Sequence, residues 1–213
     1  MHIPDGFLTG EAAAIGAVTG AAGVAVCLRG ARETMRERDL PLAGLAAAFF
    51  LVGDAPMVPI TVGTQGHLLG GTLAVALLGP WVGGLTIAVV CVIQALALGD
   101  GGVSTLGLTI TNLALIPAFV GYPIIVGLRR VVSLPVACAA AAVVDVMLGA
   151  LVFTAEMTLG AAVHIDKAAL AASTLGAYAV ISVVEATITA LVVRGLLSIR
   201  PDLVRAGRRR AGA

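Results

Sequence analysis

Charged residues are scarce in this chain. They make up 12% of its 213 residues, against 59% that are hydrophobic, and the mean hydropathy is +1.06. In a soluble domain about a quarter of the residues carry a charge. The shortage excludes an ordinary soluble protein and predicts an all-α, polytopic protein of the inner or plasma membrane, in contact with the lipid bilayer. The net charge of +1 favours no nucleic-acid partner.

Phosphate-binding and catalytic motifs are also missing from the sequence. It has no Gly-x-x-x-x-Gly-Lys-Ser/Thr loop, so ATP hydrolysis would need a separate chain. It has no His-Glu-x-x-His or Ser-His-Asp arrangement, and its three histidines do not form a catalytic zinc set. The three cysteines are widely spaced within apolar runs, which fits packed thiols better than disulfides. An enzyme is therefore disfavoured.

Apolar stretches divide the chain into about seven predicted transmembrane helices. They cover residues 10–28, 42–52, 68–78, 81–98, 105–128, 134–154 and 168–193. The second and third stretches are short and interrupted by glycine, so they are expected to bend or to re-enter the membrane around a site. Between the third and the fourth, Gly79-Pro80 predicts a tight hairpin, with a kink in one long helix as the alternative.

Basic residues are distributed unevenly among the connections. If the N-terminus lies outside and the number of helices is odd, twelve of the thirteen basic residues fall on one side, and only Lys167 falls on the other. The twelve are Arg29, Arg32, Arg36, Arg38, Arg129, Arg130, Arg194, Arg200, Arg205, Arg208, Arg209 and Arg210. This bias predicts an outer N-terminus and a cytoplasmic C-terminus. The connection 53–67, the turn 99–102 and the connection with His164 then share the outer side with the N-terminus.

The chain opens with Met1-His2-Ile3-Pro4-Asp5-Gly6-Phe7-Leu8, which lacks the basic region of a secretory signal. Met1 is expected to stay, because the large His2 disfavours its removal. The Met1 amine, the His2 amide nitrogen and His2 Nδ1 can then chelate one metal ion through five- and six-membered rings. Pro4-Asp5-Gly6 predicts a turn that folds this segment back. The alternative is a frayed tail with an idle histidine.

A fourth nitrogen would complete a planar site for this chelate. Planar nitrogen sites suit Ni(II) and Cu(II), whereas Co(II) can use the same donors with another geometry. His67, within Gly66-His67-Leu68-Leu69-Gly70-Gly71 on the predicted outer side, is the candidate, and an ordinary polar loop residue is the alternative. Candidate supporting residues, which can accept from a ligand imidazole or line the way in, are Asp54, Thr64, Gln65, Asp100 and Asn112.

Three other polar residues need an interpretation. Asp145 and Glu185 lie within predicted spans, where a carboxylate costs about 2.5 kcal/mol or more. Each is either functional or a hydrogen-bonded packing residue that faces the bundle. His164 is expected to be a polar residue of an outer loop rather than a capture residue.

Several motifs together resemble those of the CbiM/NikM family, the substrate-specific membrane subunits of energy-coupling factor transporters for cobalt and nickel. They are the opening Met1–Leu8, Gly66–Gly71, Leu78-Gly79-Pro80-Trp81, Ile93-Gln94-Ala95-Leu96, Asp100-Gly101-Gly102, Asn112 and Ile199-Arg200-Pro201-Asp202-Leu203. The resemblance implies that the Met1 amine, the His2 amide and ring, and His67 bind the transported Ni²⁺ or Co²⁺. It further implies a seven-helix fold with the N-terminal segment plugged into the bundle. The implied partners are a transmembrane coupling subunit, paired cytoplasmic ATPase subunits and often a small accessory membrane subunit.

The loop before His67 departs from the family pattern. Met57-Val58-Pro59-Ile60 and Gly63-Thr64-Gln65-Gly66 stand where the family has Asn-(Phe/Ile)-Pro-Val and Gly-Gly-Thr-Ser-Gly. Because hydrogen bonds behind a ligand orient it, this difference bears on metal preference more than on binding. A planar set of nitrogen donors favours nickel, whereas the resemblance to the family is equally compatible with cobalt. Imported cobalt would supply cobalamin synthesis.

The sequence predicts one transmembrane domain over residues 1–204, with a metal-binding segment at 1–9 and a basic cytoplasmic tail at 205–213. Two alternatives to a subunit of an ATP-driven importer stay open. One is a self-sufficient secondary metal permease, which would need coupling carboxylates such as Asp145 and Glu185. The other is a structural membrane subunit that binds no metal.

Overall fold

The computed structural model describes residues 1–37, 39–54, 56, 58–61 and 64–207, with the backbone alone described for 58–61 and 64–65. Helices dominate the described chain, which confirms the all-α prediction. A short antiparallel pair, β1 (Val58–Thr61) and β2 (Thr64–Gly66), interrupts them just before His67.

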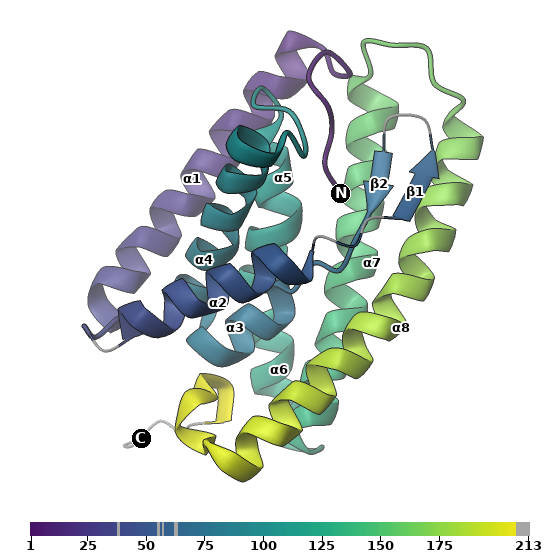
Figure 1. Ribbon diagram of the computed structural model, residues 1–213. Coiled ribbons are helices and arrows are strands. Elements are labelled where there is room, and N and C mark those ends of the chain that lie inside the picture. The colour runs from purple at the N-terminus through teal and green to yellow at the C-terminus, as the bar shows by residue number, and fades with distance from the viewer. Residues whose placement is uncertain (38, 55, 57, 62–63, 208–213) are drawn as a thin grey trace.

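Among the described residues, five helical segments are long and apolar enough to cross a membrane. They are α1 (Gly10–Thr34), α4 (Pro80–Ile93) with η1 (Gln94–Leu98), the run of α5 (Leu106–Ile110), η2 (Thr111–Leu115), η3 (Pro117–Gly121) and α6 (Tyr122–Leu128), α7 (Leu134–Gly160), and α8 (Lys167–Ile199). Figure 1 shows them gathered into one bundle, with α8 slanted along one side. The chain is a multi-pass membrane protein.

The second and third predicted spans correspond to α2 (Asp39–Gly53) and α3 (Gly71–Leu78). With eight residues at 1.5 Å each, α3 is about 12 Å long, less than half of a hydrocarbon layer about 30 Å thick. It does not cross a membrane alone, so the count of about seven spans stays a prediction. Instead, α3 continues the segment that carries His67 into the bundle.

A tight hairpin joins α3 to α4, as the sequence predicts. Gly79 has φ 82°, a conformation that favours glycine, and Pro80 begins α4. The two helices touch through backbone, because a Cβ added at Gly83 would lie 2.7 Å from the carbonyl oxygen of Ala74 and from Cα of Val75. The hairpin therefore fixes α3 against a long helix.

The end of the bundle that carries residues 4–9, 99–105 and 161–166 is here termed the N-terminal end (Figure 1). The opposite end, with residues 34–39, 78–80 and 200–207, is termed the C-terminal end. There the chain folds back through η4 (Pro201–Leu203) and η5 (Arg205–Gly207), and Val204 and Ala206 are fully buried. Residues 205–207, placed by the sequence in a basic tail, therefore lie against the bundle.

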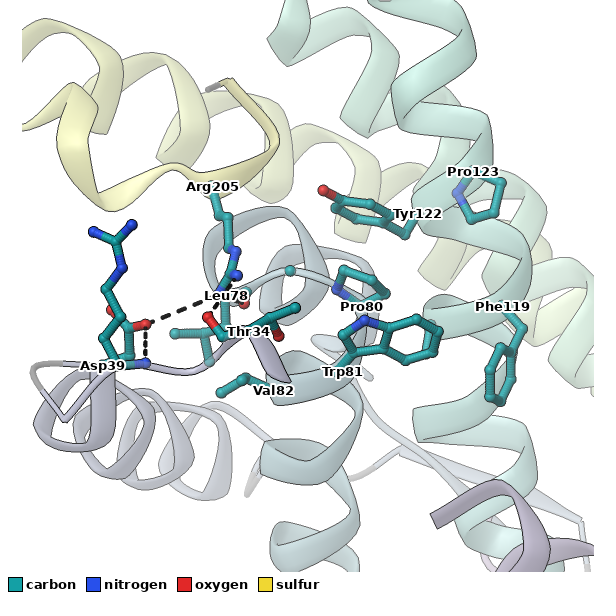
Figure 2. Close-up of a pocket in the computed structure, with 13 residues that line it drawn as sticks. Thr34, Asp39, Leu78, Pro80, Trp81, Val82, Phe119, Tyr122, Pro123 and Arg205 are labelled. Atoms are coloured by element: carbon teal, nitrogen blue, oxygen red, sulfur yellow. Dashed lines mark hydrogen bonds and ion pairs between the residues drawn. The ribbon is translucent and has the colours of Figure 1, made fainter. Parts of the chain in front are cut away.

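Arg205 holds this C-terminal segment against the bundle through hydrogen bonds and an ion pair. It donates to the carbonyl oxygens of Thr34 at 3.0 Å and Leu78 at 3.4 Å, and it lies 3.9 Å from the carboxylate of Asp39. Arg205 lines a pocket of about 610 Å³ together with Trp81 and Tyr122. Figure 2 shows its side chain directed toward Leu78 and Thr34. One side chain thus links the ends of α1 and α3 and the start of α2.

Candidate metal centre

The N-terminal segment runs from α1 back into the bundle, where the N-terminus lies among the helices (Figure 1). Met1 and Ile3 are each 1% exposed, so the segment is buried rather than frayed. Its backbone is held by the loop after η1, because the Ile3 carbonyl oxygen accepts from Gly102 N at 2.8 Å and from Thr105 Oγ1 at 2.5 Å. The free amine is therefore placed at a defined position inside the protein.

The predicted turn at Pro4–Gly6 forms and directs the segment inward. Gly6 has φ 83°, and Phe7 N donates to the Pro4 carbonyl oxygen at 3.4 Å. Asp5 accepts from Val103 N at 3.1 Å and from Ser104 N at 2.8 Å, and the bonds from Ser104 lower the pKa of its carboxyl group. These bonds tie the turn to the same loop that holds Ile3.

His2 and His67 meet in the interior of the N-terminal end. Their rings are stacked, with centroids 5.0 Å apart and planes inclined by 24°. His2 is 6% exposed and His67 2% exposed. One ligand atom from each histidine and one from Asp100 lie within 4.8 Å of one another. Residues that are 65 positions apart in the sequence therefore form one compact donor cluster.

The hydrogen bonds of the two rings leave nitrogen atoms available. His67 Nδ1 lies 2.6 Å from the carbonyl oxygen of Leu68. Because a carbonyl oxygen only accepts, Nδ1 carries the proton and Nε2 carries a lone pair. Among the described residues, His2 Nε2, His67 Nε2 and Asp100 Oδ2 are buried without a hydrogen-bond partner. Such atoms are rare in native proteins. His67 Nε2 is open to a ligand, whereas His2 Nε2 and Asp100 Oδ2 lie 3.6 Å from each other.

Asp100 and Gly101 shape the surroundings of His2. The Asp100 Oδ2 atom lies 3.6 Å from His2 Nε2, and burial raises the pKa of the Asp100 carboxyl group. A Cβ added at Gly101 would lie 2.9 Å from His2 Nδ1, closer than real Cβ atoms approach. The imidazole thus has a carboxylate beside one nitrogen and a glycine that makes room for the other.

Burial sets the protonation state of the donor nitrogens. Desolvation lowers the pKa of the Met1 amine from 8.0 to about 5 and the pKa of His67 from 6.5 to about 3. Desolvation, with repulsion from the amine and from His67, also lowers the pKa of His2 well below 6.5. All three groups are therefore neutral at pH 7, and their lone pairs are available to a cation.

The Met1 residue has contacts on both sides of its backbone. Its amine donates to the Tyr178 hydroxyl oxygen at 2.8 Å, which connects it to α8. Its side chain lies against α7, where a Cβ added at Gly149 would approach Met1 Sδ to 2.9 Å. The amine is thus held by a hydrogen bond and by packing of its own side chain.

Asp100 is the one predicted supporting residue that the described structure brings to the histidines. The side chains of Thr64 and Gln65 lie outside the described part. Asp54 accepts from Gln94 Nε2 at 3.3 Å, and burial raises the pKa of its carboxyl group to about 8. Asn112 donates to Glu156 at 2.8 Å.

The remaining predicted polar residues occupy other places. His164 is exposed and lies outside the cluster, as expected for a loop residue. Asp145 accepts from the Thr72 hydroxyl at 2.6 Å. Glu185 accepts from Leu69 N at 2.7 Å and Gly70 N at 3.0 Å. Both carboxylates are therefore hydrogen-bonded within the bundle.

Sequence reasoning missed Tyr178, which holds the amine, and Thr105, which holds Ile3. A signal for Tyr178 was present in the last span. Thr174, Tyr178, Ser182, Glu185 and Thr189 recur every three or four residues in an apolar helix, and all five are buried. A polar stripe at helical spacing in an apolar span faces the protein interior.

Comparisons with known proteins agree with this geometry. A family model described as the CbiM "Cobalt uptake substrate-specific transmembrane region" matches residues 2–203. A putative metal transport protein of Haloquadratum walsbyi is 33% identical over 96% of this chain and 93% of its own length. A putative fused nickel transport protein, NikMN, of Archaeoglobus fulgidus is 33% identical over 96% of this chain and 68% of its own.

A solved crystal structure of a transition metal transporter has the same fold. It superposes with a TM-score of 0.89 over the full length of both chains, at 28% sequence identity. Because the family model covers almost the entire chain, this protein belongs to the CbiM/NikM family of cobalt and nickel transport proteins, whose members are membrane transporters and not enzymes.

Proposed function

We propose that this chain is the substrate-binding membrane subunit of an ATP-driven importer and that it captures one Ni²⁺ or Co²⁺ ion from the outer side. The observation that carries the proposal is the free N-terminus, buried in the bundle next to two stacked histidines. The amine donates to the Tyr178 hydroxyl oxygen, and because it is neutral its lone pair remains available to a cation. A transition metal ion is the partner that amine and imidazole nitrogens share.

The ion would be held by four nitrogen atoms. Covalent connectivity supplies the Met1 amine, the His2 amide nitrogen and His2 Nδ1, and His67 contributes Nε2. Binding through His2 Nδ1 leaves its Nε2–H directed at Asp100, 3.6 Å away. His67 Nδ1–H is already engaged by Leu68. Each ring would then have an acceptor behind it, the arrangement that orients metal-binding histidines.

The nitrogen donors favour a transition metal ion but are compatible with both Ni(II) and Co(II). Four nitrogens near one plane favour Ni(II), whereas Co(II) accepts the same donors with additional axial ligands. The amide nitrogen binds only after losing its proton, so capture releases protons and weakens at acid pH. If cobalt is the ion, its uptake would supply cobalamin synthesis.

Partners supply the energy for transport in this proposal. A transmembrane coupling subunit would reorient the loaded chain, separate ATPase subunits would hydrolyse ATP, and a small accessory membrane subunit would complete the complex. The relative from Archaeoglobus fulgidus is described as a fused nickel transport protein, which supports an accessory part. The basic residues near Thr34, Arg129 and Arg200 support a cytoplasmic C-terminal end.

Equilibrium metal binding to paired histidine variants tests the proposal. In detergent-solubilised protein with its native N-terminus, His67→Ala should bind Ni(II) or Co(II) much more weakly than the unmodified chain. His164→Ala is the matched control, since His164 is exposed and lies outside the cluster, and it should bind normally. Equal affinities for the unmodified chain and His67→Ala, or a loss confined to His164→Ala, would refute the site.

A further inference from the structure

Glu185 is a buried carboxylate that the capture site does not use directly. It lies in α8, is 3% exposed, and places both of its oxygens on backbone N–H groups. Oε2 accepts from Leu69 N at 2.7 Å, and Oε1 accepts from Gly70 N at 3.0 Å. These N–H groups come before the first turn of α3 and therefore lie outside its helical bonding.

The segment held by Glu185 is the one that carries His67. Leu69 and Gly70 connect His67 to α3, and neighbouring groups pack tightly against this connection. Gly70 has φ 66° and lies against the ring of Phe50, and a Cβ added at Gly71 would lie 2.5 Å from the Leu113 carbonyl oxygen. A shift of this backbone would therefore move the histidine.

A single peptide group joins His67 to Glu185. The carbonyl oxygen of Leu68 accepts from His67 Nδ1 at 2.6 Å, and the N–H of the same peptide, which belongs to Leu69, donates to Glu185. The peptide plane is rigid, so fixing its N–H end also fixes its C=O end. The carboxylate therefore acts on the imidazole across one peptide unit, and the two hydrogen bonds polarise each other.

The same helix also contacts the other ligand-bearing segment. Tyr178, seven residues before Glu185 and on the same face of α8, accepts the hydrogen bond of the Met1 amine. Seven residues of helix span about 10.5 Å, or two turns. The helix α8 therefore contacts the Met1 amine through Tyr178 and, two turns later, the His67 segment through Glu185.

We propose that Glu185 is a positioning residue for metal capture. Its carboxylate fixes the Leu68–Leu69 peptide, and this peptide turns the His67 ring so that Nε2 faces the ion. The inference rests on the proposed function, in which His67 is a ligand. It adds a residue of α8, 118 positions away from His67 in the sequence, to the determinants of affinity.

Substitution of Glu185 by Gln tests the proposal with little change in shape. A carboxylate accepts on both oxygens, whereas the amide of Gln has one acceptor, so one of the two backbone N–H groups loses its partner. Glu185→Gln should weaken Ni(II) or Co(II) binding by roughly 10- to 100-fold, the usual effect of losing a group that orients a ligand. The matched control is Ser182→Ala, one turn earlier, where the hydroxyl donates to the Ala179 carbonyl oxygen at 2.7 Å.

A double-mutant cycle separates positioning from general loss of structure. In a His67→Ala background, Glu185→Gln should cause no further loss of affinity, because no imidazole remains to be oriented. The d–d absorption band of Ni(II) in Glu185→Gln should also move toward that of His67→Ala. An equal loss with and without His67, or an affinity and a band unchanged in Glu185→Gln, would overturn the inference.

The experiment distinguishes this inference from the proposed function. If His67→Ala binds like the unmodified chain, the capture site itself fails and the role of Glu185 fails with it. If His67→Ala loses binding while Glu185→Gln does not, only the positioning role fails. If Glu185→Gln does not fold, Glu185→Asp tests the positioning role instead. It keeps both carboxylate oxygens, but its side chain is one methylene shorter, so they lie farther from the N–H groups of Leu69 and Gly70. Its affinity should fall below that of the unmodified chain, and unchanged affinity would refute the role.

Discussion

The two ends of the bundle treat their polar groups in opposite ways, partly buried groups at one end and buried groups at the other. At the C-terminal end, Arg205 donates to the carbonyl oxygens of Thr34 and Leu78 and lies beside Asp39. At the N-terminal end, Nε2 of His67 is buried without a hydrogen-bond partner among the described residues. Satisfied polar groups stabilise a fold, whereas unsatisfied ones in an ordered interior indicate a missing ligand. The difference distinguishes contacts that stabilise the fold from a site that binds a ligand.

Moving the amine out of the N-terminal end should have the largest effect. One extra residue before Met1 removes the amine from the chelate and places added atoms where the chain is 1% exposed. Binding of Ni(II) and Co(II) should fall below detection in equilibrium dialysis. Proteolytic removal of the extra residue, which restores the Met1 amine, should restore binding, and tight binding by the uncleaved chain would contradict the chelate.

The same amine should make a contribution to the stability of the metal-free chain that rises with pH. Its pKa is about 5 in the folded protein and 8.0 when unfolded, so the unfolded state binds more protons between these values. This contribution to the free energy of unfolding should therefore increase from pH 5 to pH 8, by up to about 4 kcal/mol. The raised pKa of Asp54 acts in the opposite direction over the same range, so the contribution of the amine is measured by thermal melting in detergent as a difference from a control chain.

The chain extended by one residue is the control for the melting experiment. Its amine lies outside the buried position, so its melting temperature should lack this part of the pH dependence. An identical pH trend in both chains would show that another group is responsible.

Crowding of His2 should have an intermediate effect. Gly101→Ala adds a Cβ 2.9 Å from His2 Nδ1, whereas Gly99→Ala adds one with nothing within 4 Å. Both glycines have positive φ, 86° and 67°, so both variants carry backbone strain. Metal affinity should be roughly tenfold weaker in Gly101→Ala than in Gly99→Ala, about 1.4 kcal/mol, by competitive titration. Equal affinities would indicate that His2 Nδ1 is not a donor.

Loosening the C-terminal end should leave the metal site unchanged. Arg205→Ala removes two hydrogen bonds and should lower stability by about 1–3 kcal/mol. Metal affinity should stay within about a factor of two, since distant sites act independently. Thermal melting and metal titration of the same sample measure both quantities. A clear change in affinity would show that the two ends are coupled.

Hydropathy predicted the long helices well because lipid-facing helices need long apolar runs. It placed the third span at 68–78, whereas α3 begins only at Gly71 and is too short to cross. Glycine-rich sequence there permits several backbone conformations, and the choice depends on neighbours such as Phe50 and Glu185. Tertiary contacts, which hydropathy does not contain, decide such segments.

The site was predictable where covalent connectivity or charge bias constrained it. Met1 and His2 are adjacent, and the distribution of basic residues placed His67 on their side of the membrane. The contacts of Tyr178 with Met1 and of Glu185 with Leu69 join residues 177 and 116 positions apart. These contacts depend on how the helices pack. The polar residues at helical spacing in α8 indicate that this helix has a buried polar face, but they do not identify the residues that it contacts.

Metal titration of the purified chain with its native N-terminus tests the central claim most directly. Ni(II) and Co(II) should be added separately and followed by absorbance and metal content. The account predicts one equivalent of bound ion, with the yellow d–d band of a planar nitrogen site for Ni(II). Tighter Co(II) binding at the same stoichiometry would identify cobalt as the cargo. Failure of both ions to bind would contradict the site and the function proposed for it.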